Sequence, residues 1–111
     1  PTRVASRMPT HATRWDRVVA CYDILLQLNP SPGAQLARAV ALAEDQGPQA
    51  GLAALAEVSM PGSHRPAAVR AELLVRSGET GAAREAYGEA LALCRNDAER
   101  AHLRECLDAL G

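Results

Sequence analysis

Apolar residues recur along most of the chain at spacings of three and four, the period of an amphipathic helix. The clearest stretch covers residues 71–93 and is interrupted at Gly78, where one helical pattern ends and another begins. After this glycine, Ala83, Tyr87 and Ala90 fall on one face of the second helix. Two helices that meet through small residues across a short turn are typical of a helical repeat.

The same reading predicts six helices, separated by turns that contain proline, glycine or a capping residue. We expect Ser31 to cap the second helix, Gly47 and Gly78 to end the second and fourth, and Asn96 with Glu99 to form a capping box at the last. In that box the Glu99 side chain would bond to the cap residue's own amide. The predicted helices cover about residues 14–28, 32–46, 48–58, 65–77, 80–95 and 97–110.

Each predicted helix carries an apolar stripe that we expect to be buried. The expected core positions are Trp15, Val18, Val19, Tyr22, Leu25, Leu26 and Leu28, then Leu36, Ala39, Val40 and Ala43, then Leu52, Leu55 and Val58, then Val69, Leu73 and Leu74, and finally Leu103, Cys106, Leu107 and Leu110.

The helices show a degenerate internal repeat. Tyr22 and Tyr87 stand 65 residues apart, close to two periods of a repeat of roughly 34 residues. Gly47 and Gly78, 31 residues apart, occupy matching turns. The prediction is an all-α fold, a short tetratricopeptide-like stack of antiparallel helix hairpins with a C-terminal capping helix. The first helix is then the second half of an incomplete repeat.

Composition agrees with one helical domain. The 111 residues are rich in Ala, Leu and Val, with no Phe, one Trp and two Tyr, and Ala and Leu are strong helix formers. Residues 1–13 carry two prolines and little periodicity, so we expect a linker or frayed end there and a helical domain over 14–111. Because the chain begins with Pro1, we expect it to be part of a longer protein.

Net charge, hydropathy and cysteine usage limit the partners and the compartment that we expect for this chain. Twelve basic and thirteen acidic side chains give a formal charge of -1, which argues against direct contact with nucleic acid. No apolar run approaches the roughly 20 residues that span a bilayer, so no membrane contact is expected. Cys21, Cys94 and Cys106 lie in apolar stripes, which favours buried or partly buried thiols in a reducing cytoplasm over a redox or metal role.

An ordered series of motifs runs along the chain. It comprises Trp15, Tyr22, Asp23, Leu25, Leu26, Pro30, Ser31 and Pro32, then Arg38 to Ala41, Gly47 to Leu52, Arg70 to Leu74 and Asn96 to Arg100. This series resembles the C-terminal extension of a group of bacterial extracytoplasmic-function sigma factors. The resemblance covers roughly residues 11 to 111, and departures from the pattern are Gly33-Ala34, Ala37 and Ser77.

The resemblance implies a cytoplasmic regulatory module. Members of this group carry promoter-reading sigma regions 2 and 4 ahead of the extension, and neither region is present in these 111 residues. The extension is thought to act through protein contacts, either with the sigma factor's own N-terminal regions or with RNA polymerase core. Promoter recognition would belong to those other regions.

The residues offer little for catalysis or for a cofactor. His11, His64 and His102 show no i, i+4 pair, so a zinc site is poorly supported, and no motif positions a nucleophile or cradles a phosphate. We therefore expect neither enzyme activity nor a bound metal or cofactor.

The candidate partner-binding residues lie on the first helices of the hairpins, apart from Trp15. They are Arg38, Glu44, Arg65, Glu72, Val75, Arg76 and Trp15. Ala37, Ala41 and Ala68 would share the groove with them. Two alternatives stay open: Arg38 and Arg70 can instead pair with Asp23, Asp45 or Glu72, and Trp15 can be a core residue rather than a docking anchor.

Three functions are compatible with the sequence. The first is the regulatory domain of a sigma factor. The second is a free-standing adaptor that binds a peptide in its concave groove. The third, a small-molecule sensor that uses the groove between hairpins, has no support from a particular motif.

Overall fold

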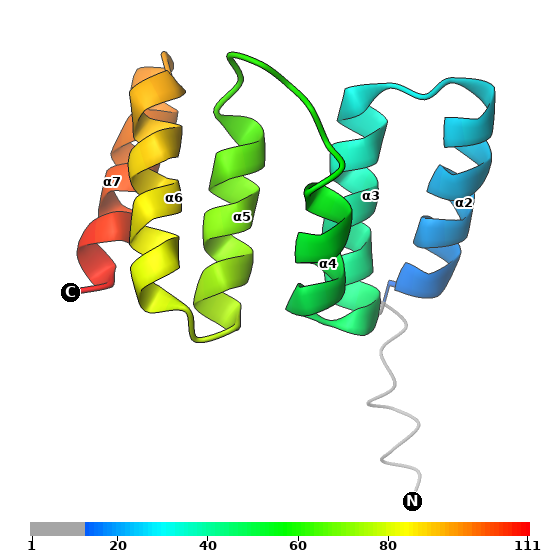
Figure 1. Ribbon diagram of the computed structural model, residues 1–111, viewed down its shortest axis with the longest axis horizontal. Coiled ribbons are helices and arrows are strands. Elements are labelled where there is room, and N and C mark those ends of the chain that lie inside the picture. Colours follow the sequence, from blue (N-terminus) through cyan, green and yellow to red (C-terminus); the bar gives the residue numbers. More distant parts are fainter. Residues whose placement is uncertain (1–12) are drawn as a thin grey trace, which may run out of the picture.

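The computed structural model describes residues 13–111, and within this range it is all-α. Successive helices alternate in direction and stand side by side (Figure 1). Their bounds are α2 Trp15–Leu28, α3 Pro32–Gln46, α4 Pro48–Leu55, α5 Arg65–Arg76, α6 Thr80–Leu93 and α7 Asp97–Ala109. The expected linker over residues 1–13, with His11, lies outside the described residues except for Thr13.

The turn chemistry of the sequence sets most of the helix ends. Ser31 Oγ accepts a hydrogen bond of 3.1 Å from the Ala34 amide at the start of α3, which confirms the predicted cap. Gly47 and Gly78 have φ values of 102° and 79°, a region that favours glycine, and they end α3 and follow α5. The expected positions of the breaks are therefore confirmed.

Two local expectations are wrong. Helix α4 ends at Leu55, so Val58 lies in the connection to α5 rather than on the helix. At α7, Asn96 Oδ1 accepts a hydrogen bond of 2.9 Å from the Glu99 amide, as predicted. The Glu99 carboxylate, however, lies 3.1 Å from His64 Nε2 instead of closing the capping box. The Glu99 carboxylate therefore pairs with His64, which is distant in the sequence, and not with the nearby amide of Asn96.

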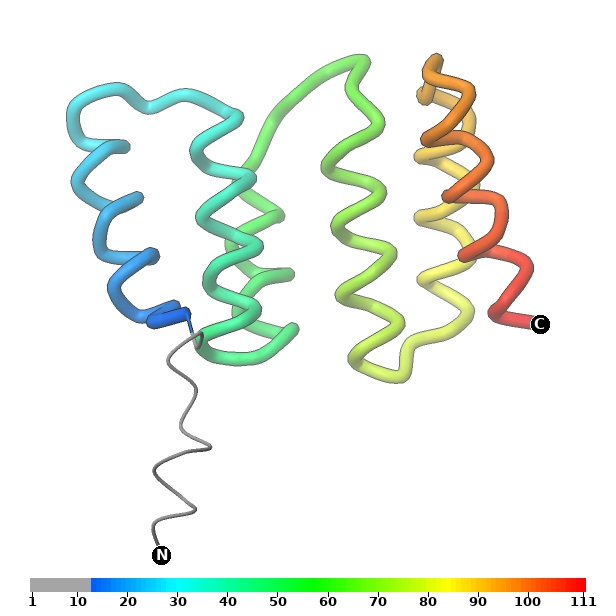
Figure 2. The backbone as a smooth tube through the Cα atoms, turned by 180° about the vertical axis from the view of Figure 1, so that it is seen from behind, coloured from blue at the N-terminus to red at the C-terminus, as the bar shows by residue number. Residues whose placement is uncertain are grey.

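The helices form a sequential stack. α3 packs against α4 and α5 against α6 as hairpins, α2 packs against α3, and α7 packs against α6 (Figures 1 and 2). α3 also contacts α5, so the first helices of the two hairpins line one side of the stack. The result is a helical-repeat-like fold with α7 at its C-terminal end.

Small side chains dominate the core. The largest cluster joins α5, α6 and α7, with Tyr87 and Leu103 among alanines. Two smaller clusters join α2 to α3 through Val19 and Leu42, and α3 to α4 through Leu36 and Leu55. Alanine-rich helix faces allow neighbouring backbones to approach closely, which compensates for the missing phenylalanines.

Several residues expected in the core are exposed. Leu25 and Leu28 on α2 are 44% and 79% exposed, and Val40 on α3 is 38% exposed. Cys21 is exposed too, against the expectation of a buried or partly buried thiol. α2 buries one narrow face against α3, and the other described helices leave its outer flank uncovered. A broad apolar stripe on this helix therefore exceeds what its neighbour can cover.

Candidate functional site

The side of the stack that carries α3 and α5 holds two hollows, which share Val69. The first, of about 340 Å³, lies between α2, α3 and α5. The second, of about 380 Å³, lies between α5, α6 and α7. The first is lined by Trp15, Val18, Tyr22, Gly33, Leu36, Ala37, Val40, Ala41, Arg65 and Val69; the second by Ala68, Val69, Glu72, Tyr87, His102, Leu103 and Cys106.

Three of the predicted partner-binding residues are brought together as an ion-pair network. Arg76 Nη1 lies 3.0 Å from Glu44 Oε2, and Arg76 Nη2 lies 3.0 Å from Glu72 Oε2. The hydrogen bond to Glu44, with the two carboxylate charges, raises the pKa of Arg76. This network joins α3 to α5, and in it the single positive charge of Arg76 is paired with both carboxylates.

Arg38 lies apart from the other predicted residues. Its Nε donates a hydrogen bond of 2.6 Å to Asp23 Oδ1, which links α3 to α2. It lines a separate hollow of about 220 Å³ together with Leu26 and Glu57. Of the two interpretations left open by the sequence, the ion pair with Asp23 is the one observed. Arg70 likewise pairs with an acid, although its partner is Glu89 on α6 rather than Glu72.

Trp15 and Arg65 share the first hollow, whereas Val75 is separate. Trp15 is half-buried and packs against the α2–α3 cluster, so it contributes to the core and to the wall of the hollow. Arg65, the first residue of α5, is exposed and lines the same hollow. Val75 is 39% exposed and belongs to neither of the two hollows. The predicted residues therefore do not form one continuous site.

The outer flank of α2 is an apolar surface, and the sequence analysis had assigned two of its residues, Leu25 and Leu28, to the core. Ile24 and Leu28 are 61% and 79% exposed, and Leu25 beside them is 44% exposed. Ile24 and Leu28 are four residues apart and so share a helix face, with Cys21 one turn earlier. The signal in the sequence was the width of the apolar stripe, which is too broad for one neighbouring helix.

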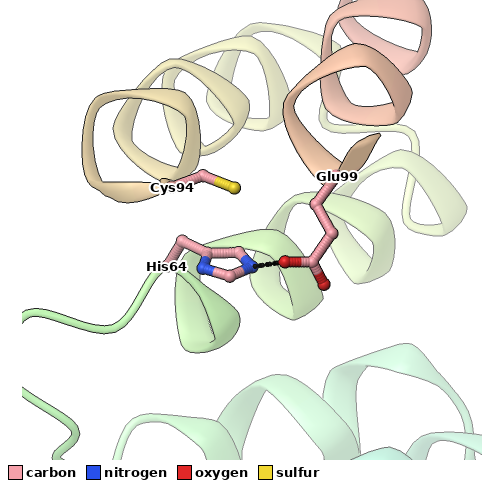
Figure 3. Close-up of side chains that lie close together, drawn as sticks. All are labelled: His64, Cys94 and Glu99. Carbon is pink, nitrogen blue, oxygen red and sulfur yellow. Dashed lines mark ion pairs between the residues drawn. The ribbon is translucent and has the colours of Figure 1, made fainter. Parts of the chain in front are cut away.

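A mixed cluster of donor atoms lies where α5, α6 and α7 meet. His64 precedes α5, Cys94 follows α6, and Glu99 lies in the first turn of α7 (Figure 3). One donor atom from each, a ring nitrogen, the sulfur and a carboxylate oxygen, lies within 4.8 Å of the others. The sequence analysis missed this cluster because its three members lie far apart in the sequence and show no recognised metal-binding spacing.

Comparisons with known proteins give one relative and no family. The chain is 36% identical over 100 residues to a protein of Rhizobium meliloti (strain 1021) whose name describes it only as uncharacterized. The match covers 88% of this chain and 24% of that protein, so the chain spans about a quarter of the relative's length. No family model matches the sequence, and no solved structure matches it either. Among the described residues, none of the helices has the length and apolarity needed to cross a membrane.

Proposed function

We propose that this chain is the C-terminal regulatory domain of an extracytoplasmic-function sigma factor. It controls transcription initiation in the bacterial cytoplasm through protein–protein contacts, with the sigma factor's own N-terminal regions or with RNA polymerase core. It carries out no catalytic step and does not touch the promoter itself.

The observation that supports this proposal most directly is the open apolar flank of α2. Ile24 and Leu28 would each contribute about 1–2 kcal/mol to a contact that removes them from water. An apolar stripe of this kind at one end of a helical stack is typical of a surface that meets another protein. The flank lies on α2, the first of the described helices along the sequence.

Two further findings agree with this proposal. The ordered motifs that resemble the sigma-factor extension include Trp15, Tyr22 and Asp23 of this same helix. The match to about a quarter of the longer Rhizobium meliloti protein shows that a segment of this kind occurs together with additional chain. A regulatory contact with the rest of such a protein would use a surface like the α2 flank.

The first experiment measures the mass of the native polypeptide in its host with an antibody to residues 14–111. A chain two to three times longer than 111 residues, or more, is expected. A native chain of about this size contradicts the sigma-factor proposal and leaves the adaptor.

The second experiment tests the surface. The purified domain is titrated with sigma regions 2 and 4 and, separately, with RNA polymerase core of the same bacterium. The double variant I24D/L28D is expected to weaken the contact at least about tenfold, because it places two charges in an apolar interface. The matched control is Ala101→Asp on the exposed side of α7. Equal binding by both variants contradicts a role for the α2 flank.

One specific observation favours the adaptor function. The first hollow is lined by Trp15, by apolar residues and by Arg65, a combination that suits a short peptide with an acidic residue. Screening the domain against a peptide library, with Arg65→Glu as the variant, separates the two proposals. Selective peptide binding that Arg65→Glu abolishes and I24D/L28D leaves intact favours the adaptor.

A further inference from the structure

We propose that His64, Cys94 and Glu99 form a binding site for a divalent transition metal, with Zn²⁺ as the preferred ion. The three side chains supply an imidazole nitrogen, a thiolate sulfur and a carboxylate oxygen, all of which are Zn²⁺ ligands in proteins. They come from three separate segments, and their donor atoms lie within 4.8 Å of one another (Figure 3). The fourth position of a tetrahedral site is left to water.

The spacing of the donors suits such an ion. Ligands bonded to Zn²⁺ at about 2.0–2.3 Å in a tetrahedral arrangement lie roughly 3.3–3.6 Å from one another. His64 Nε2 and Glu99 Oε1 are already 3.1 Å apart. The Cys94 sulfur lies within 4.8 Å of both, so it has to approach them by no more than about 1.5 Å.

Hydrogen bonds at the backbone hold two of the three ligands, Cys94 and Glu99, in place. The Cys94 amide donates a hydrogen bond of 2.9 Å to the Ala90 carbonyl at the end of α6. The Glu99 amide is fixed by the Asn96 cap, and the Arg100 guanidinium donates to the Cys94 carbonyl at 3.1 Å. Binding therefore needs side-chain adjustment rather than folding of a loop.

Burial and charge also fit a metal site with one open side. Cys94 is 4% exposed, the His64 side chain 19% and the Glu99 side chain 56%, so the sulfur end is dry and the carboxylate end faces water. The thiolate and the carboxylate together neutralise a divalent cation. Binding releases the Cys94 thiol proton to solvent.

The expected consequence is a clamp between the last hairpin and the capping helix. His64 marks the start of α5, Cys94 the end of α6 and Glu99 the start of α7. A metal bound to all three binds the folded chain more tightly than the unfolded one, and it raises the apparent stability of the fold by mass action. This role is independent of the proposed regulatory function, because it concerns the end of the stack opposite to α2.

The test uses the reduced full chain and Co²⁺ as a spectroscopic substitute for Zn²⁺. One equivalent of Co²⁺ is expected to give a thiolate-to-cobalt charge-transfer band and the visible absorption of a tetrahedral site. Zn²⁺ is expected to displace it and to raise the melting temperature. A titration without a thiolate band overturns the proposal.

Variants assign the ligands. Glu99→Gln and His64→Gln are each expected to weaken Zn²⁺ binding at least about tenfold in competition with a chromophoric chelator. Cys94→Ser is expected to remove the thiolate band. Because the Glu99 side chain is largely exposed, Glu99→Gln keeps the test valid even where Cys94→Ser fails to fold.

A second sulfur–nitrogen pair supplies the matched control. Cys106 Sγ lies 3.6 Å from His102 Nε2 on α7, outside the proposed site. The double variant H102Q/C106S is expected to bind Zn²⁺ as the unmodified chain does. Loss of binding in this control with retention in Glu99→Gln and His64→Gln places the metal at Cys106 and overturns the proposal.

Discussion

At the scale of single residues, Tyr87 is a central residue of the core. It is 6% exposed and is the largest side chain of the cluster that joins α5, α6 and α7. Ala83 and Ala90, predicted to share its helix face, are each 0% exposed, so that part of the sequence pattern is confirmed. Burial, and then the neighbouring Cys106, raise the pKa of Tyr87 to about 12.

This raised pKa predicts a loss of stability at alkaline pH. The folded chain holds the phenol proton more tightly than the unfolded chain, whose tyrosine pKa is about 10. The stabilising contribution is therefore fully present below about pH 10 and is lost as the pH rises toward 12.

Urea unfolding followed by circular dichroism, between pH 8 and 11.5, measures this loss. The variant Tyr87→Phe is expected to lose less stability over this range than the unmodified chain, by about 1–2 kcal/mol. The matched control is Tyr22→Phe, which makes the same substitution at the half-buried tyrosine of α2. The same pH dependence in Tyr87→Phe and the unmodified chain would contradict the assignment.

At the scale of helices, the contact between α3 and α4 depends on one glycine. A Cβ atom at Gly51 would lie 2.6 Å from the Ala43 Cβ and 3.0 Å from the Ala39 carbonyl oxygen. Both distances are too short for a comfortable contact, and the second neighbour is backbone. The two helices therefore approach as closely as they do because position 51 has no side chain.

Replacing Gly51 by alanine is expected to destabilise the chain. Overpacking costs about 1–3 kcal/mol, and the better helix propensity of alanine returns up to about 1 kcal/mol, so a net loss near 1 kcal/mol follows. Gly88 on α6 is the matched control, because a Cβ there meets nothing within 4 Å.

Gly88→Ala should therefore stabilise the chain by about 0.5–1 kcal/mol. Urea midpoints at an unchanged m-value measure both effects. Shifts of the same sign in the two variants would show that the α3–α4 contact is not tight.

At the scale of the whole molecule, stability is expected to be nearly additive along the stack. Each helix packs mainly on its neighbours in sequence, as in a quasi-one-dimensional repeat array. α7 covers the C-terminal cluster with Leu103, which is 5% exposed, and with the partly buried Leu107 and Leu110. Removal of α7 should therefore destabilise α6 first, because α6 is the helix it packs against.

Removal of α7, by ending the chain at Arg95, is expected to cost at least about 2 kcal/mol of local stability in α6. Native-state hydrogen exchange should show a large fall in protection for amides near Leu91 and a smaller one near Leu42 on α3. An equal fall in both helices would indicate one fully cooperative unit and contradict the additive description.

Much of the fold could be predicted because local chemistry sets it. Ser31, Gly47, Gly78 and Asn96 mark helix ends through caps and positive φ values, which depend on a few neighbouring residues. The boundary errors, as at the end of α4, arise where no strong stop signal is present and packing decides instead.

The candidate sites were harder to predict from the sequence. Periodicity identifies an apolar stripe on α2, but not how much of it a neighbour covers, so Leu25 and Leu28 were assigned to the core. Arg38 and Arg76 were both candidates for the groove, with an ion pair left open for Arg38. In the structure Arg38 pairs with Asp23 on α2, and Arg76 pairs with Glu44 and Glu72. Ion-pair partners across helices depend on rotation and register, which a pattern of one helix does not contain.

The sequence by itself therefore determined the helical class, the helix order and most turns of this protein, because these follow from 3.6-residue periodicity and from capping and turn chemistry. Only the tertiary structure decided that the outer flank of α2 stays open and that the α3–α4 contact closes on Gly51. It also brought His64, Cys94 and Glu99 together from three segments. Such groupings depend on how helix ends meet in space, and that is set by the sum of many packing contacts rather than by any local pattern.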